Sequence, residues 1–111
     1  MTIEVHDVPR RHRYVITVDG AEVGFMTYRL APGVLDLLHA EIDPEWSGRG
    51  LAGRLAAAAL DDARRRGLGV LPHCPYVRHY VDQHPADYLD LVPAGRRAEF
   101  GWPDGPGPGA A

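Results

Sequence analysis

The alternation of hydrophobic and polar residues predicts a β-meander in the first part of the chain. Tyr14–Val18 and Glu22–Arg29 are rich in β-branched and aromatic residues, and Val34–Ile42 continues the same pattern. Asp19-Gly20 separates the first two runs and is typical of a tight hairpin turn, because that turn needs positive φ angles. Ile3–Val5 is expected to add a short strand at the edge of the sheet.

After Gly50 the hydrophobic pattern changes to a helical period. One stripe carries the apolar residues Leu51, Ala52, Leu55, Ala56, Ala59, Leu60 and Ala63. Gly67 is expected just beyond the end of this helix. Gly69–Leu71 is typical of a short buried strand, and Tyr76–Gln83 and Ala86–Val92 are expected to be short helices. The predicted fold class is therefore α/β in the α+β sense: a mainly antiparallel mixed sheet with a central helix.

The length and composition predict a single domain followed by a tail. A chain of 111 residues buries one core. From Pro93 onward the composition changes to glycine, proline and alanine, so we expect a folded domain over residues 1–92 and a flexible tail over 93–111. Phe100 and Trp102 are the tail residues best able to dock on the domain.

The charge and the cysteine content exclude several classes of function. A net charge of −3 disfavours a general binder of nucleic acid or of an anionic membrane. No apolar run has the length of a membrane span. The single cysteine, Cys74, cannot form an intrachain disulfide, so we expect a reducing, cytoplasmic location. All 12 basic residues are arginine.

Gly48-x-Gly50-x-x-Gly53 spells the fingerprint of dinucleotide-binding enzymes, but its surroundings do not fit one. Three predicted strands precede it, no carboxylate follows at about twenty positions, and too few residues remain for a doubly wound sheet. A phosphate-binding P-loop is also excluded, because no Gly-Lys-Ser/Thr follows the glycines. Glycines between a strand and a helix still expose backbone N–H groups at the positive end of the helix dipole, which favours an anion. Gly53 lies inside the helix and is expected to permit close packing.

The stretch Glu45–Ala52, after a long strand and before an amphipathic helix, resembles the coenzyme A pyrophosphate loop of GCN5-related N-acetyltransferases. With His39-x-Glu41 before the loop and Pro72-x-Cys74-x-Tyr76 after the helix, residues 3 to 92 resemble a small, truncated subfamily of that fold. The resemblance implies a reduced acyl-CoA N-acyltransferase fold that binds acetyl-CoA. It implies that pyrophosphate contacts come from Trp46, Ser47, Gly48, Arg49, Gly50, Leu51 and Ala52. It also implies that Ile42 and Asp43 pair with the pantetheine arm.

Two residues could act as the base that acetylation of an amine requires. An alkylamine has a pKa of about 10.4, so a proton acceptor helps at neutral pH. Strict alternation places His39 and Glu41 on the same face of their strand as Leu35 and Leu37. The alternatives are an ordinary hydrogen-bonded histidine and a surface carboxylate.

Three residues after the helix are candidates for the acyl-transfer chemistry. The resemblance places Cys74 near the acetyl end of the cofactor, where it could accept the acetyl group or protonate the leaving thiolate. Tyr76 and Tyr80 compete for the second role, and an inert buried cysteine is the alternative. His73, Cys74, His79 and His84 match no common zinc spacing, so no metal is expected.

The function expected from the sequence is transfer of acetyl from acetyl-CoA to an unidentified amine. The alternative is an acetyl-CoA-binding module without turnover, and a dinucleotide oxidoreductase is a distant third. The acceptor and the oligomeric state stay open.

Overall fold

The computed structural model describes residues 1–102 and contains one five-stranded sheet in the order β1-β2-β3-β4-β5. The strands are β1 (Ile3–Val8), β2 (Arg13–Val18), β3 (Ala21–Ala31), β4 (Val34–Ile42) and β5 (Gly69–Pro72). The first four strands form an antiparallel meander, and β5 pairs with β4 in parallel. The prediction of a mainly antiparallel mixed sheet is therefore confirmed.

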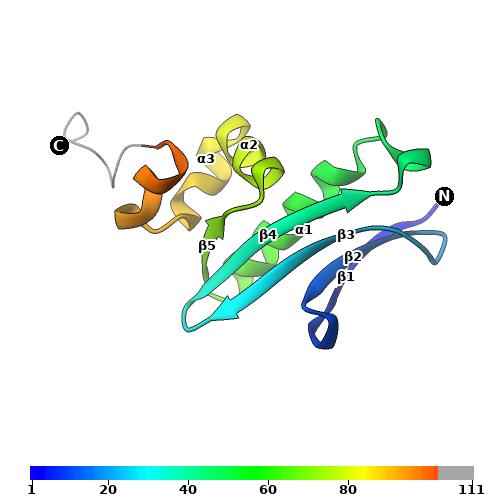
Figure 1. Ribbon diagram of the computed structural model, residues 1–111, viewed down its shortest axis with the longest axis horizontal. Helices are drawn as coiled ribbons and strands as arrows, with labels where there is room; N and C mark the ends of the chain where they lie inside the picture. The colour runs from blue at the N-terminus through cyan, green and yellow to red at the C-terminus, as the bar shows by residue number, and fades with distance from the viewer. Residues whose placement is uncertain (103–111) are drawn as a thin grey trace.

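The helices lie on one face of the sheet and at its β5 end. They are α1 (Leu51–Arg65), α2 (Pro75–Gln83) and α3 (Pro85–Tyr88), with short 3-10 turns η1 (Pro9–Arg11), η2 (Pro44–Trp46), η3 (Leu89–Leu91) and η4 (Ala94–Phe100). Figure 1 shows α1 crossing behind the sheet, while α2 and α3 gather beside β5. The buried side of α1 is the stripe that the sequence predicts, except that Ala52 is only half-buried. None of these helices has both the length and the apolarity needed to cross a membrane.

A β-bulge in β4 changes which side chains face the helix. Thr27 pairs with His39 and Tyr28 with Leu37, so Leu38 has no partner in β3. The extra residue shifts the alternation by one position. Ala40 and Ile42 consequently pack against the core, together with Leu35 and Leu37 of the first half of the strand, while His39 and Glu41 are exposed. The prediction that His39 and Glu41 share a face with Leu35 and Leu37 is therefore wrong.

The second half of β4, beyond Leu37, does not pair with β5. Pairing with β5 ends at Leu37 and Pro72, and the Cys74 N–H then donates to the Leu37 carbonyl at 2.7 Å. Pro72 has no N–H to continue a ladder, and the chain turns away into α2. Within the described residues, the backbone edge of β4 from Leu38 to Ile42 is left without a strand beside it.

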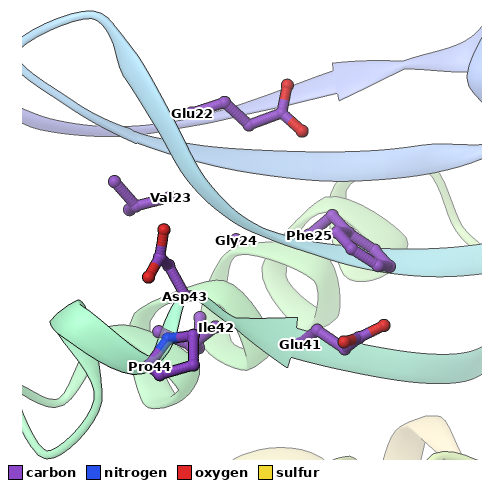
Figure 2. Close-up of a pocket in the computed structure, with 8 residues that line it drawn as sticks. All are labelled: Glu22, Val23, Gly24, Phe25, Glu41, Ile42, Asp43 and Pro44. Atoms are coloured by element: carbon purple, nitrogen blue, oxygen red, sulfur yellow. The ribbon is translucent and has the colours of Figure 1, made fainter.

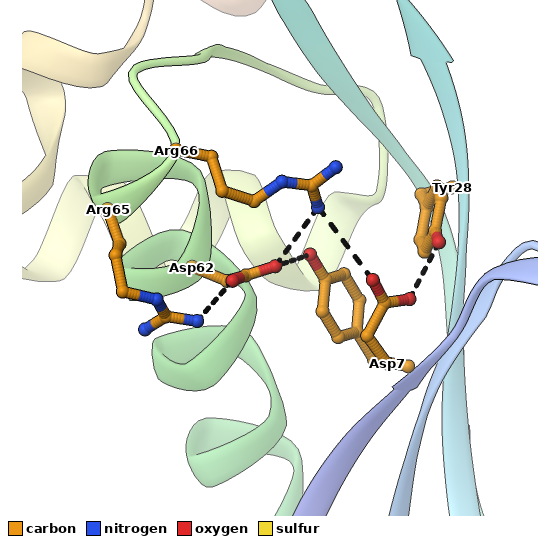
Figure 3. Close-up of polar contacts among 6 residues, drawn as sticks. Asp7, Tyr28, Asp62, Arg65 and Arg66 are labelled. Carbon is orange, nitrogen blue, oxygen red and sulfur yellow. Dashed lines mark hydrogen bonds and ion pairs between the residues drawn. The ribbon is translucent and has the colours of Figure 1, made fainter.

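The end of α1 is tied to the sheet by two buried phenols that bind partly exposed carboxylates (Figure 3). Tyr28 Oη donates to Asp7 at 2.6 Å, and Tyr14 Oη donates to Asp62 at 2.6 Å. Arg66 lies between the two carboxylates, 3.2 Å from Asp62 and 3.7 Å from Asp7. Burial first, and then the hydrogen bond to the carboxylate, raise the pKa of each phenol. The cluster therefore favours neutral tyrosines over ionised ones.

The ordered chain extends past residue 92. Ala94–Phe100 forms η4, and Phe100 is buried in a second cluster with Leu71 and Val92. Trp102 packs against this cluster and donates through Nε1 to Asp82 at 3.1 Å. The prediction of a flexible tail is wrong for this segment, because two aromatic side chains provide burial that the Gly/Pro composition conceals. Residues 103–111 lie outside the described part of the chain.

We predict that Phe100→Ala lowers the free energy of unfolding by about 3–5 kcal/mol, as expected for a deleted buried aromatic ring. Urea denaturation measures the change. The control is Arg96→Ala, which removes an exposed ion pair with Glu99 and should cost less than about 1 kcal/mol. Similar small losses in both variants would show that Phe100 is not anchored.

We also predict alkaline destabilisation through Tyr14 and Tyr28. Their pKa values are raised in the folded state, so their stabilising contribution is present below the unfolded value of about 10 and is lost as the pH rises above it. The free energy of unfolding should therefore fall between about pH 10 and pH 11. In the Tyr14→Phe/Tyr28→Phe double variant this fall should be smaller. An equal pH dependence in both proteins would refute the assignment.

Candidate functional site

The loop between β4 and α1 is held in place by its own hydrogen bonds. Asp43 accepts from the Glu45 N–H through Oδ1 at 3.0 Å and from the Trp46 N–H through its carbonyl at 2.8 Å. Ser47 Oγ donates to the Pro44 carbonyl at 2.9 Å. The Asp43 N–H is also used, because it donates to the Val23 carbonyl of β3 at 2.7 Å. Asp43 therefore holds the loop through its side chain, its carbonyl and its N–H.

Two glycines of the loop have backbones that other residues rarely adopt. Gly48 and Gly50 have φ angles of 76° and 75°, and a Cβ at either position would meet no atom within 4 Å. Glycine is thus needed for the left-handed conformation, and the space beside it is open.

The loop delivers the chain to an uncapped helix N-terminus. Gly50 is the N-cap of α1, no side chain caps it, and the first turn holds no acidic residue. The Arg54 N–H donates to the Gly50 carbonyl at 3.2 Å. The preceding N–H groups, those of Leu51, Ala52 and Gly53, have no acceptor within the first 102 residues. They lie at the positive end of the helix dipole and can bind an anion.

A cavity of about 360 Å³ lies at this end of the helix, where Leu51 and Ala52 line it. It is lined by Ile42, Trp46, Ser47, Gly48, Gly50, Leu51, Ala52 and Tyr76. The structure thus brings together every residue that the sequence predicts for the cofactor except Asp43 and Arg49. Arg49 lies beside the cavity instead, with its guanidinium 4.8 Å from the centre of the Trp46 ring.

Of the three predicted acyl-transfer residues, only Tyr76 lines this cavity. Its side chain is partly exposed, and its pKa is raised, mainly by burial and secondly by Tyr80. The ring of Tyr80 stacks between Tyr76 and His84. Cys74 is only 1% exposed and belongs to the main core. A thiol in that position has no access to a ligand in the cavity unless α2 moves.

The two predicted bases lie on the other side of the sheet from α1. His39 Nε2 is 3.1 Å from Glu41 Oε2, and both side chains are exposed. Figure 2 shows Glu41 beside Phe25 at a second cavity, of about 240 Å³, formed by the start of β3 and the end of β4. Glu22 also lines it, and this carboxylate is already paired with Arg11. His39 and Glu41 are therefore accessible; they contact each other, and the centre of the His39 ring also lies 6.3 Å from the centre of the Phe25 ring.

A histidine–aspartate pair that sequence reasoning missed lies where β4 and β5 separate. The side chain of Asp36, on β4, is 2% exposed, and its Oδ1 is 2.6 Å from His73 Nδ1. Its Oδ2 is 3.2 Å from the Arg29 guanidinium. The sequence signal that could have revealed this pair is Asp36 itself, a carboxylate inside the apolar run Leu35–Leu37. A carboxylate in a buried strand needs charged or hydrogen-bonding partners. No group of three or more His, Cys, Asp or Glu side chains in residues 1–102 could hold a metal ion.

Comparison with known proteins agrees with this architecture. Residues 13–91, from β2 to the end of η3, match the family model described as GCN5-related N-acetyl-transferase. Protein NATD1 of Homo sapiens is 31% identical over 93 residues, which cover 81% of this chain and 82% of that protein. Protein NATD1 of Gallus gallus is 30% identical over 91 residues, covering 79% and 83% of the two chains. The matched region contains the loop, the helix α1 and the strand that follows it, and the chain belongs to the GCN5-related N-acetyltransferase family.

Proposed function

We propose that this protein binds acetyl-CoA and transfers the acetyl group to an amine. The observation that carries the proposal is the uncapped N-terminus of α1, which opens into a cavity beside an unpaired strand edge. A diphosphate fits free N–H groups, and a chain of amides fits a free β-edge. Membership of the acetyltransferase family supports the same ligand.

The loop and α1 would hold the pyrophosphate through backbone groups. The N–H groups of Leu51, Ala52 and Gly53 supply donors and a favourable dipole. The left-handed backbones of Gly48 and Gly50 let the loop curve around an anion without a side chain in its way. Binding of this kind depends on backbone geometry, so it tolerates no bulky or acidic residue at the glycines.

The free edge of β4 would hold the pantetheine arm. From Leu38 to Ile42 this edge has no strand neighbour in the described chain, and amides of a ligand can pair with it as an added strand would. Close packing between β3 and β4 positions Ile42 at the cavity. A Cβ at Gly24 would lie 2.6 Å from Ile42 Cδ1 and 2.7 Å from the Glu41 carbonyl oxygen, so glycine permits this approach.

Tyr76 is the residue best placed to manage the proton of the leaving group. Acetyl-CoA, when bound, supplies a thioester whose transfer releases a thiol. The Tyr76 phenol is protonated at neutral pH, since its pKa is raised above the ordinary value of about 10, so Oη can donate its proton to sulfur. Cys74 would have to leave the core to compete, and Tyr80 lies behind Tyr76 in the aromatic stack.

An acetyl-CoA-binding module without turnover is the second candidate. The exposure of His39 and Glu41 favours it, because neither residue has a fixed orientation toward the cavity. Both candidates predict binding through the loop, and only transfer to an amine separates them.

We predict that Gly50→Glu weakens acetyl-CoA binding at least tenfold, about 1.4 kcal/mol, because it places a negative charge against the pyrophosphate. Isothermal titration calorimetry measures the affinity. Gly33→Glu is the matched control: it has the same φ of about 76°, equally open space and a position at the far end of β4. Unchanged affinity in a folded Gly50→Glu protein would remove the loop from the site.

We predict that Tyr76→Phe lowers kcat for acetyl transfer by about 10²-fold while the affinity for acetyl-CoA stays within about twofold, as expected for a lost general acid. Tyr88→Phe is the control. The Tyr88 hydroxyl donates to Asp61 at 3.0 Å, and Tyr88 does not line the cavity. Steady-state release of the CoA thiol gives kcat, and isothermal titration calorimetry gives the affinity. Equal rates in the Tyr76→Phe and wild-type proteins would show that Tyr76 is not the general acid.

A further inference from the structure

The Asp36–His73 pair has the geometry of an oriented imidazole. His73 Nδ1 is 2.6 Å from a carboxylate that is almost completely buried, while the His73 side chain is 46% exposed. Nε2 makes no hydrogen bond to any residue of the described chain. An ionised Asp36 places the proton of neutral His73 on Nδ1 and leaves the lone pair of Nε2 available.

The surroundings of His73 hold the ring in one position. Phe100 of η4 contacts it edge-on, with ring centres 5.0 Å apart. The charged groups around the pair are Arg29, which binds Asp36 from β3, and Arg96 and Glu99 on η4. Arg96 and Glu99 are mainly paired with each other. The imidazole is thus fixed by a carboxylate on one side and an aromatic ring on another.

The pair lies at the point where the free edge of β4 begins. Asp36 immediately precedes Leu37, and His73 immediately precedes Cys74, the two residues joined by the last hydrogen bond between the strands. Beyond this point the edge of β4 from Leu38 to Ile42 is unpaired, and Ile42 at its end lines the cavity. By contrast, His39 and Glu41 have no buried partner.

We infer that His73, oriented by Asp36, is the general base that takes the proton of the acceptor amine. This inference rests on the proposed acetyl transfer. His73 is the catalytic residue, and Asp36 is a positioning residue that acts through it.

The proton and electron balance of the step is complete with His73, Tyr76, the two substrates and water. Nε2 of His73 takes one proton from the cationic acceptor nitrogen, and the lone pair that this frees forms the new C–N bond to the acetyl carbon. The bonded nitrogen then releases its second proton to water. The C–S bond breaks, its electron pair stays on sulfur, and Tyr76 Oη supplies the proton that makes the free thiol. His73 and Tyr76 then regain their starting protonation by exchange with water. No oxidant or metal is required.

The first test is spectroscopic and needs no substrate. Long-range ¹H–¹⁵N spectra of the ¹⁵N-labelled protein should show neutral His73 with its proton on Nδ1, and Asp36→Asn should increase the share of the other tautomer. His73→Asn assigns the signal. A His73 ring protonated on Nε2 in the wild-type protein would overturn the inference, because the lone pair would then face Asp36.

The second test is kinetic and compares two kinds of acceptor. Release of the CoA thiol is measured with ethanolamine, spermidine and a lysine-containing peptide, which are cations at neutral pH, and with hydroxylamine, which is already neutral. His73→Asn keeps a donor toward Asp36 but cannot act as the base. We expect it to lower kcat/KM for the cationic amines by about 10²-fold, to abolish the acidic limb of their pH profile and to change the hydroxylamine rate less than about threefold. His6→Asn, an exposed histidine of β1, is the control.

The outcomes separate the two proposals. A wild-type protein that binds acetyl-CoA but transfers nothing to any of these acceptors overturns the proposed function and the base with it. A wild-type protein that transfers acetyl while His73→Asn is unchanged overturns the base alone. An equal loss with amines and hydroxylamine also overturns it, because the role would then be structural. A loss confined to His39→Asn would move the base to that residue.

Discussion

The hydrogen bond from the Cys74 N–H to the Leu37 carbonyl is the point on which the functional half of the molecule depends. Before it, β4 and β5 form an ordinary parallel pair. After it, the bulge at Leu38 and the turn into α2 separate the strands, because neither element can continue the ladder. A free β-edge would ordinarily invite aggregation, and here it lies beside a cavity instead. Under the proposed function, the separation of the two strands makes this exposed edge available to a ligand with amides.

Local signals in the sequence were sufficient to predict the elements and their order. Asp19-Gly20 specified the hairpin, and the helical period after Gly50 specified α1, because turn chemistry and side-chain period are properties of neighbouring residues. The faces of β4 could not be predicted in the same way. One unpaired residue, Leu38, exchanges the two faces, and its effect depends on the partner strand rather than on the pattern itself. Phe100 was expected to be able to dock, but its partners Leu71 and Val92 could not be predicted, since both are separated from it along the chain and meet it only in the fold.

The part of the candidate site that is formed by backbone groups could be predicted from the sequence. The part that is formed by side chains could be predicted less well. The glycine pattern identified the loop, because positive φ angles require glycine wherever the fold places them. The motif around Cys74 located the right turn of the chain, yet the side chain that lines the cavity there is Tyr76, two residues on. Burial of the cysteine follows from the way the first turn of α2 packs, which no local pattern encodes. The contact between Asp36 and His73 spans 37 positions and arises only from the parallel pairing of β4 and β5.

The edge-on packing of Phe100 against His73 joins the last described segment to the edge of the sheet where we propose the base. Under that proposal, a turn that is remote in sequence contributes to the alignment of a proton acceptor. In practical terms, a protein fused to the C-terminal side of this chain, or a protease cut placed there, should leave residues 94–102 intact. Damage to that segment would reach the chemistry without touching a single residue of the cavity.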